Sequence, residues 1–189
     1  MKENKMIILS APSGSGKSTI INYLLHKGFP LEFSVSATTR APRGTEKNGV
    51  EYYFYSVDEF KEKIKNGDFV EFEEVYENRF YGTLKSECER IWAKGNVIVF
   101  DVDVAGGMRL KKLFGDKALS LFIQAPSVEV LRQRLEGRKT DSAEEIEKRI
   151  SKAAYEMQFA DKFDAIVVND ELQKACETAE HLLQDFLNK

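Results

Sequence analysis

The sequence predicts an α/β fold, a three-layer α/β/α core in which helices cover both faces of a parallel sheet. Short, unbroken apolar runs alternate along the chain with longer segments of helical periodicity, a pattern typical of strands buried on both faces. A glycine-rich loop stands between the first apolar run and the first helical segment. The 189 residues are about the length of one domain, so we expect a single folded unit over 1–189.

The apolar pattern places the main elements in order. Each apolar run precedes a segment with apolar residues three or four apart. We expect strands at Met6–Leu9, Val97–Phe100, Leu119–Ile123 and Ala165–Val168, and helices at Lys17–Lys27, Val104–Phe114, Ser127–Leu135 and Glu171–Leu187. Two Ser-x-x-Glu pairs, at Ser56 and at Ser142, have the spacing of a capping box. The second pair is predicted to open a helix that runs to about Lys162.

The segment from Phe33 to about Thr83 has a different composition. It is rich in Ser, Thr, Tyr and Gly, and it alternates like a strand in Glu51–Ser56 and in Phe69–Tyr76, with a short helix between. We therefore expect a small mixed or mostly antiparallel β insertion after the first strand–helix unit.

Charge and composition exclude several classes of protein. Lys and Arg number 28 against 31 Asp and Glu, so the chain lacks the basic excess of a nucleic-acid-binding protein. Its uncharged stretches are shorter than the roughly 20 residues that span a bilayer, and no signal-peptide pattern is present. The two cysteines form no disulfide framework, and neither histidine has a partner at metal-ligand spacing. We expect a cytoplasmic protein with no nucleic-acid partner, no membrane partner and no structural zinc.

The glycine-rich loop, Ala11-Pro-Ser-Gly-Ser-Gly-Lys-Ser18, matches a phosphate-binding loop except that Ala11 replaces the first glycine. Gly14 and Gly16 allow backbone N–H groups to turn toward a phosphate, and the following helix adds its partial positive charge. Lys17 can reach the β- and γ-phosphates, and the Ser18 hydroxyl can bind Mg²⁺. The strand before and the helix after disfavour an ordinary turn. The predicted ATP-binding residues of the loop are Ala11, Pro12, Ser13, Gly14, Ser15, Gly16, Lys17, Ser18 and Thr19.

Acids and arginines elsewhere suggest further phosphate chemistry. Asp101 and Asp103 follow a predicted strand at its carboxyl end, where α/β sheets bind ligands. Either acid can bind Mg²⁺, directly or through water, or orient a nucleotide, and capping of the next helix is the alternative for Asp103. Arg40 and Arg43 lie in a turn-rich loop and offer two guanidinium forks to a phosphate.

Three more arginines surround a break between two helices at Gly137, where a hinged lid could close on a phosphoryl group. These are Arg134, Arg138 and Arg149, and Arg138, beside the break, is the best placed of them. Arg134 is expected on a solvated helix face.

Several motifs, in this order along nearly the whole chain, resemble the guanylate kinase family. They are Phe33–Arg43, Asn48–Phe54, Phe69–Glu71, Tyr81–Thr83, Asp101–Asp103, Arg132–Arg138 and Val167–Asp170. The resemblance implies a P-loop NTPase core (about 1–32, 90–125 and 157–189), a GMP-binding insertion (about 33–89) and a lid (about 126–156). It implies Mg²⁺-dependent, reversible transfer of the γ-phosphoryl group from ATP to GMP, and to dGMP, in purine nucleotide metabolism.

Roles for individual residues follow from the matching positions. The resemblance implies that Lys17, Arg40, Arg138 and Arg149 are catalytic, that Arg138 and Asn169 also contact ATP, and that GMP is bound by Ser36, Arg40, Arg43, Tyr52, Glu71, Tyr81, Thr83, Asp101 and Asp103. Within that set, Ser36, Glu71 and Thr83 match the positions that read guanine. The chain departs from the family pattern at Lys139, which replaces a glycine after the lid arginine, and at Ala105, which replaces a glutamine after the paired acids.

The chemistry of guanine agrees with a carboxylate at such a site. Guanine donates from N1 and N2 together, so one carboxylate accepts both hydrogen bonds, whereas adenine presents an acceptor at N1. A period of two places Glu71 and Glu73 on one face of their strand, with Val70, Phe72 and Tyr76 on the other. Spacing leaves either acid open, and the resemblance selects Glu71. Two alternatives remain. One is a monophosphate kinase of other specificity. The other is a phosphopeptide-binding module without catalytic activity, and the intact glycine-rich loop disfavours this second alternative.

Overall fold

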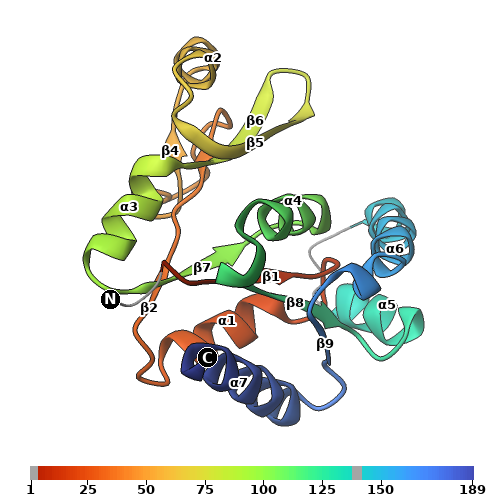
Figure 1. Cartoon of the computed structure of the whole chain (residues 1–189). Coiled ribbons are helices and arrows are strands. Elements are labelled where there is room, and N and C mark those ends of the chain that lie inside the picture. The colour runs from red at the N-terminus through yellow and green to blue at the C-terminus, as the bar shows by residue number, and fades with distance from the viewer. Residues whose placement is uncertain (1–3, 138–141) are drawn as a thin grey trace. The chain divides into compact units, whose positions relative to one another are not determined.

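The computed structural model describes residues 4–137 and 142–189, and Figure 1 traces their ribbon. By their contacts these residues divide into two units. The first runs up to Leu31 and resumes at Val99–Lys189, and the second is Glu32–Ile98. In the part of the chain described, no helix is both long and apolar enough to cross a membrane.

The larger sheet has five strands in the order β2-β7-β1-β8-β9. Their bounds are β1 Met6–Ser10, β2 Leu31–Phe33, β7 Val97–Asp101, β8 Ala118–Gln124 and β9 Ala165–Val168. β8 runs parallel to both of its neighbours, with Met6 opposite Ala118 and Leu121 opposite Ala165. All five residues of β1 are buried, as expected for an apolar strand covered on both faces.

Helices cover both faces of this sheet. In Figure 1, α4 lies over one face, and α1 and α7 lie together over the other. The helices of the first unit are α1 Lys17–Leu25, α4 Val104–Phe114, α5 Val128–Gly137, α6 Ala143–Met157 and α7 Leu172–Asn188. The predicted α/β class, with a parallel sheet and helices on both sides, is confirmed.

Helices α5 and α6 pack on one another through their own apolar cluster, which includes Leu131, Leu135, Ile146 and Ile150. The predicted capping box at the start of α6 is present, since the Ser142 side chain accepts from the Glu145 N–H and the Glu145 carboxylate accepts in return. The matching box at Ser56 opens α2.

The prediction that α6 runs to about Lys162 was wrong. The helix ends at Met157, where the N–H of Gln158 bonds back only three residues, to the Tyr155 carbonyl, at 3.2 Å. A short 3₁₀ turn, Ala160–Lys162, follows. The chain turns there because Ala160 and Phe163 are buried in a cluster with Phe122. Burial of these apolar side chains outweighs the helix propensity of the segment.

The second unit contains a mixed four-stranded sheet in the order β4-β3-β6-β5. β6 is antiparallel to β3 and β5, and β3 is parallel to β4. The elements are β3 Ala37–Thr38, β4 Tyr53–Phe54, α2 Val57–Lys65, β5 Phe69–Tyr76, β6 Arg79–Leu84 and α3 Lys85–Ala93. Its core is aromatic, with the Phe60 ring stacked 4.3 Å from Phe69 and 5.4 Å from Phe80 between ring centroids.

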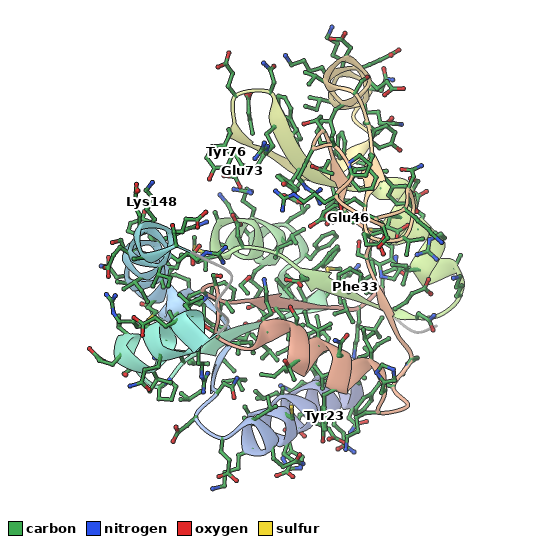
Figure 2. The ribbon with its side chains drawn as sticks, turned by 180° about the vertical axis from the view of Figure 1, so that it is seen from behind. Tyr23, Phe33, Glu46, Glu73, Tyr76 and Lys148 are labelled. Atoms are coloured by element: carbon green, nitrogen blue, oxygen red, sulfur yellow. The ribbon has the colours of Figure 1, made fainter. Side chains whose placement is uncertain are left out.

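Two register shifts interrupt the alternation of β5, one between Phe69 and Glu71 and one between Glu74 and Tyr76. Glu71 and Glu73 still share a face, as predicted, because they pair with Thr83 and Tyr81 two residues apart on β6. Tyr76 was predicted on the opposite face, and this was wrong. The second shift pairs Tyr76 with Arg79, which returns it to the side of Glu73, and Figure 2 shows these two side chains near each other.

Candidate active site: a phosphate loop and an acceptor face

The loop between β1 and α1 has the backbone of an anion cradle. Gly14 and Gly16 have φ values of 93° and 92°, in the left-handed region that favours glycine. The N–H of Ser15 closes a turn on the Pro12 carbonyl at 3.2 Å. Gly16 is the N-cap of α1 and provides no side-chain cap, so the first N–H groups of this helix point toward the space enclosed by the loop.

Asn169, just after β9, supports this loop from behind. It is 4% exposed, and its amide nitrogen donates to the Ser15 carbonyl at 2.8 Å. A Cβ on Gly16 would lie 2.2 Å from that nitrogen, so both φ and close packing require glycine. The predicted contact of Asn169 with adenine stays a prediction. The structure shows a residue that shapes the loop.

Arg134 was expected on a solvated face of its helix, and this prediction was wrong. Its guanidinium is half-buried and donates to the Asn169 carbonyl at 2.8 Å. This contact joins residues 35 apart in sequence, and no local pattern on α5 signals it. Arg134 therefore links α5 to the support behind the phosphate loop.

Lys17, at the start of α1, is fixed by the end of β7. Its ammonium lies 2.5 Å from an Asp101 carboxylate oxygen and donates to the Val102 carbonyl at 3.0 Å. Asp103 takes the capping alternative, since its carboxylate accepts from the Gly106 N–H at 2.7 Å and starts α4. The two acids therefore have different roles, since Asp101 pairs with the lysine of the loop and Asp103 caps α4.

A pocket of about 460 Å³ opens over the loop. Besides residues 11–19 and 101–103, it is lined from α6 by Arg149, Lys152 and Glu156. Arg149 reaches the loop itself, donating to the Ser13 hydroxyl at 2.8 Å, as a phosphate-binding arginine would need to. Sequence reasoning missed Lys152 and Glu156, although their spacing of three and seven from Arg149 places them on the same helix face.

Glu156 is a buried acid in this pocket, 8% exposed. Burial raises the pKa of its carboxyl, and the negative charge of Asp103 acts in the same direction, while Lys152 and Lys17 oppose the shift. The Lys152 ammonium lies 3.6 Å from a Glu156 oxygen. The pocket thus combines three cations, Lys17, Lys152 and Arg149, with acids that pair with two of them, Asp101 with Lys17 and Glu156 with Lys152.

The donor set of the pocket suits Mg²⁺. The Ser18 hydroxyl and the Asp101 carboxylate both line it, and Mg²⁺ prefers oxygen ligands, usually few from protein and the rest from water and phosphate. Among the described residues, no three His, Cys, Asp or Glu side chains gather into a metal-binding group. An ion here would therefore be held largely by the nucleotide, with Ser18 and Asp101 as the protein contribution.

In the second unit, Arg40 is held by a residue that the sequence reasoning did not single out. Its guanidinium pairs with both carboxylate oxygens of Glu46, at 2.8 and 3.0 Å, and its side chain is only 8% exposed. Glu46 raises the pKa of Arg40, whose guanidinium lies over the Tyr52 ring at 5.1 Å. The signal available was an acid six residues after an arginine within a turn-rich loop. Glu46 is labelled in Figure 2.

Other predicted acceptor residues gather on the same unit. The rings of Tyr52 and Tyr81 are 6.1 Å apart between centroids, and the Thr83 hydroxyl donates to the Glu71 carboxylate at 3.0 Å. Ser36 is half-buried, and its carbonyl accepts from the Tyr53 N–H at 2.9 Å.

Arg43 contributes its backbone N–H to Glu46 at 2.7 Å and lies exposed. Arg138 and Lys139 lie outside the described residues.

A buried parallel sheet, a left-handed glycine loop and a lysine at the start of the following helix define an α/β protein of the P-loop NTPase fold. A family model described as guanylate kinase matches residues 3–186, so this chain belongs to the guanylate kinase family. It is an enzyme of the nucleoside monophosphate kinase class, as the sequence motifs predict.

Relatives and solved structures agree with that assignment. A guanylate kinase from Bacteroides fragilis is 58% identical over 185 residues, covering 98% of this chain and 91% of that protein. One from Porphyromonas gingivalis is 51% identical over 186 residues, covering 98% and 99%. The crystal structure of guanylate kinase from Anaplasma phagocytophilum superposes with a TM-score of 0.78 at 29% identity, covering 100% of this chain and 89% of that one.

Proposed function

We propose that this protein transfers the γ-phosphoryl group of ATP to GMP, and to dGMP, in a reversible and Mg²⁺-dependent reaction that gives ADP and GDP or dGDP. Its place would be the recycling of GMP in cytoplasmic purine metabolism. The observation that carries the choice of acceptor is the pair formed by Glu71 and Thr83, a carboxylate and a hydroxyl joined at 3.0 Å on one face of β5 and β6.

The donor half of the reaction rests on the phosphate loop. Backbone N–H groups and Lys17 bind the phosphate oxygens of ATP, and Arg149 adds charge from α6. Phosphoryl transfer passes through a loose transition state, so positioning and charge stabilisation suffice and no covalent intermediate is needed. Bound Mg²⁺, held by Ser18 and by Asp101 directly or through water, would neutralise phosphate charge and align the donor.

The acceptor half rests on the second unit. The Glu71 carboxylate accepts from guanine N1 and N2, while the Thr83 hydroxyl and Ser36 complete the contacts to the base. Arg40, Arg43, Tyr52 and Tyr81 bind the GMP phosphate. Glu46 keeps the Arg40 guanidinium oriented and shares it with the incoming phosphate. Because Arg40 is already ordered, binding loses less conformational entropy than it would with an exposed, mobile side chain. A base that lacks the N1 and N2 donors of guanine donates no such hydrogen bonds to the Glu71 carboxylate, and so binds more weakly.

A substrate panel tests the proposal. ADP formation from ATP is followed with GMP, dGMP, AMP and UMP as acceptors, with excess Mg²⁺ and again with a chelator. We expect turnover with GMP and dGMP, discrimination of roughly 10⁴-fold against AMP, and loss of activity on chelation that added Mg²⁺ restores. Preference for AMP or UMP would refute the guanine assignment. Undiminished activity in the chelator would refute the magnesium requirement.

A further inference from the structure

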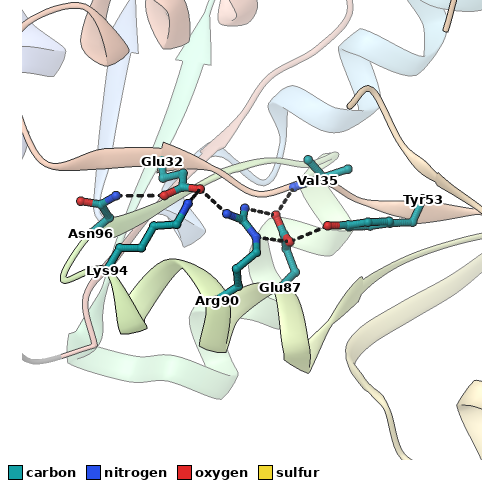
Figure 3. Close-up of polar contacts among 7 residues, drawn as sticks. All are labelled: Glu32, Val35, Tyr53, Glu87, Arg90, Lys94 and Asn96. Atoms are coloured by element: carbon teal, nitrogen blue, oxygen red, sulfur yellow. Dashed lines mark hydrogen bonds and ion pairs between the residues drawn. The ribbon is translucent and has the colours of Figure 1, made fainter. Parts of the chain in front are cut away.

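A charged side chain is buried in the second unit where no predicted ligand contact requires it. Glu87, on α3, is 2% exposed. A buried carboxylate is costly unless hydrogen bonds compensate for the lost water. Figure 3 shows that Glu87 lies at the centre of a network that joins α3 to two other segments of the unit.

Both carboxylate oxygens of Glu87 are used. Arg90 binds them side by side, at 2.9 and 2.8 Å. One oxygen also accepts from the Val35 N–H at 3.0 Å, and the other accepts from the Tyr53 hydroxyl at 3.0 Å. Although burial raises the pKa of Glu87, these hydrogen bonds outweigh it and leave the pKa below its ordinary value. Glu87 is therefore ionised, and each of its carboxylate oxygens accepts two hydrogen bonds.

The network continues through Arg90 to Glu32. Arg90 also pairs with Glu32, whose carboxylate accepts from Lys94 at 2.8 Å and from Asn96 at 2.9 Å. Arg90 is thus held between two acids and cannot easily leave Glu87. The arrangement makes α3 a fixed platform for the groups that Glu87 holds.

The two groups held by Glu87 are direct neighbours of proposed GMP-binding residues. Val35 precedes Ser36, and Tyr53 follows Tyr52. Successive side chains of an extended segment point to opposite faces, so fixing the Tyr53 hydroxyl on one side fixes the Tyr52 ring on the other. There, Tyr52 lies under the Arg40 guanidinium. The backbone of Tyr53 also donates to the Ser36 carbonyl at 2.9 Å, so the two anchored segments are tied together.

We propose that Glu87 is a positioning residue for the acceptor nucleotide. Through Tyr53 it holds Tyr52 at the phosphate end of the GMP site, and through the Val35 N–H it holds Ser36 at the base end. Glu87 itself contacts neither end. The inference rests on the proposed function in one respect, that GMP is the molecule bound on this unit.

A purely structural role makes a different prediction. A residue that only stabilises the fold, when changed, lowers the unfolding temperature and the fraction of active enzyme but leaves the affinity for GMP unchanged. A positioning residue changes the affinity for GMP in molecules that remain folded, with little change in the KM for ATP.

The experiment uses the full chain and two small changes. Tyr53→Phe removes only the hydroxyl that reaches Glu87, and Glu87→Gln removes the charge while keeping the shape. Matched controls are Tyr55→Phe, a half-buried tyrosine of the same segment, and Glu89→Gln, an exposed acid of α3. For each variant, GMP binding is measured by calorimetry without ATP, together with the KM for GMP, the KM for ATP, kcat and the unfolding temperature.

We expect Tyr53→Phe to raise both the Kd and the KM for GMP by about threefold to tenfold, with kcat and the KM for ATP within about twofold of wild type. Glu87→Gln is expected to have the larger effect, since it also disturbs the contact with Val35. The double variant should bind GMP no more weakly than Glu87→Gln alone, since the Tyr53 hydroxyl acts only through Glu87. The two controls should match the wild type. If Glu87→Gln does not fold, Tyr53→Phe still decides the question.

Two outcomes overturn the inference. One is an unchanged Kd for GMP in Tyr53→Phe, and the other is a change that the Tyr55→Phe control reproduces. Failure of the proposed function has a different signature, because the wild-type protein would then neither bind nor phosphorylate GMP. Active wild type with unaffected variants removes the positioning role alone.

Discussion

The two proposed binding regions of this protein are built in different ways. In the first unit the phosphate loop is mainly backbone, with glycines at φ values of 93° and 92°, an uncapped helix start and one lysine paired with Asp101. In the second unit the acceptor face is built of side chains, with Arg40 held in the carboxylate fork of Glu46 and Thr83 bonded to Glu71.

The difference fits what each region is proposed to recognise. A phosphate chain presents the same oxygens whatever base it carries, so a row of N–H groups and a cation bind it without selecting the base. A purine base differs from another only at its edge, so recognition needs a specific donor and acceptor pattern held by neighbouring contacts. Under the proposed function, backbone geometry provides affinity for ATP in the first unit, and side-chain chemistry provides specificity for GMP in the second.

The largest effect is expected from the lysine of the phosphate loop. Lys17→Ala should lower kcat/KM by at least about a thousandfold while the protein stays folded, because the cation that neutralises developing phosphate charge is lost. The coupled assay measures this, and circular dichroism checks the fold. Lys112→Ala, an exposed lysine of the same unit, is the control. Near-normal turnover in Lys17→Ala would mean that the loop does not hold the transferring phosphate.

The acceptor face is tested by its proposed specificity residue. Glu71→Gln should lower kcat/KM for GMP by roughly a hundredfold and reduce discrimination against AMP, since the amide offers guanine a donor where the carboxylate accepts. Glu73→Gln, on the same face two residues away, is the control and should retain GMP preference. The reverse result, with GMP preference lost only in Glu73→Gln, would transfer the role to Glu73.

The backbone character of the loop can be tested by stability. Gly16→Ala should lower the free energy of unfolding by about 2–4 kcal/mol, because an alanine pays for the left-handed conformation and its Cβ would lie 2.2 Å from the Asn169 amide nitrogen. Gly28→Ala has a similar φ of 79° but open space around it, so it should cost only about 1 kcal/mol. Urea unfolding measures both. Equal losses would show that the contact with Asn169 does not constrain the loop.

The smallest expected effect concerns the acid network of the second unit. Although burial raises the pKa of Glu32, hydrogen bonds from Lys94, Arg90 and Asn96 lower it from 4.5 to about 2. The folded state therefore favours the ionised form, so its stabilisation is complete above about pH 4.5 and is lost as the pH falls toward about 2.

Between about pH 5 and about pH 2.5, wild type should consequently lose roughly 1–2 kcal/mol more unfolding free energy than Glu32→Gln, allowing for partial solvent screening. Urea unfolding across that range measures the slope, and Glu62→Gln, an exposed acid of α2, should behave like wild type. Parallel slopes for wild type and Glu32→Gln would contradict the network's contribution.

Much of the fold could be predicted because it depends on neighbours in sequence. Apolar runs set the strands, with β9 matching its predicted bounds, and Ser142 with Glu145 set the start of α6. The phosphate loop is contiguous as well, so its glycines and Lys17 were readable from a strand–loop–helix pattern. The order of motifs along the chain was enough to indicate the family.

Other properties depend on partners far away in sequence, and only the tertiary structure decided them. Arg134 bonds to Asn169, and Glu87 is buried because Val35 and Tyr53 reach it from other segments. Strand pairing with its bulges, not the period of two, put Tyr76 beside Glu73.

The physical reason is the range of each interaction. Turn geometry, capping and hydrophobic periodicity act over a few residues and are written in the local sequence. The partner of a charged side chain is chosen by burial and by the strands that fold beside it, so an aspartate can cap a helix, as Asp103 does, or pair with the lysine of the phosphate loop, as Asp101 does. The amino-acid sequence by itself determined most of the elements, the loop and the family, and the fold decided where α6 ends and which side chains act together.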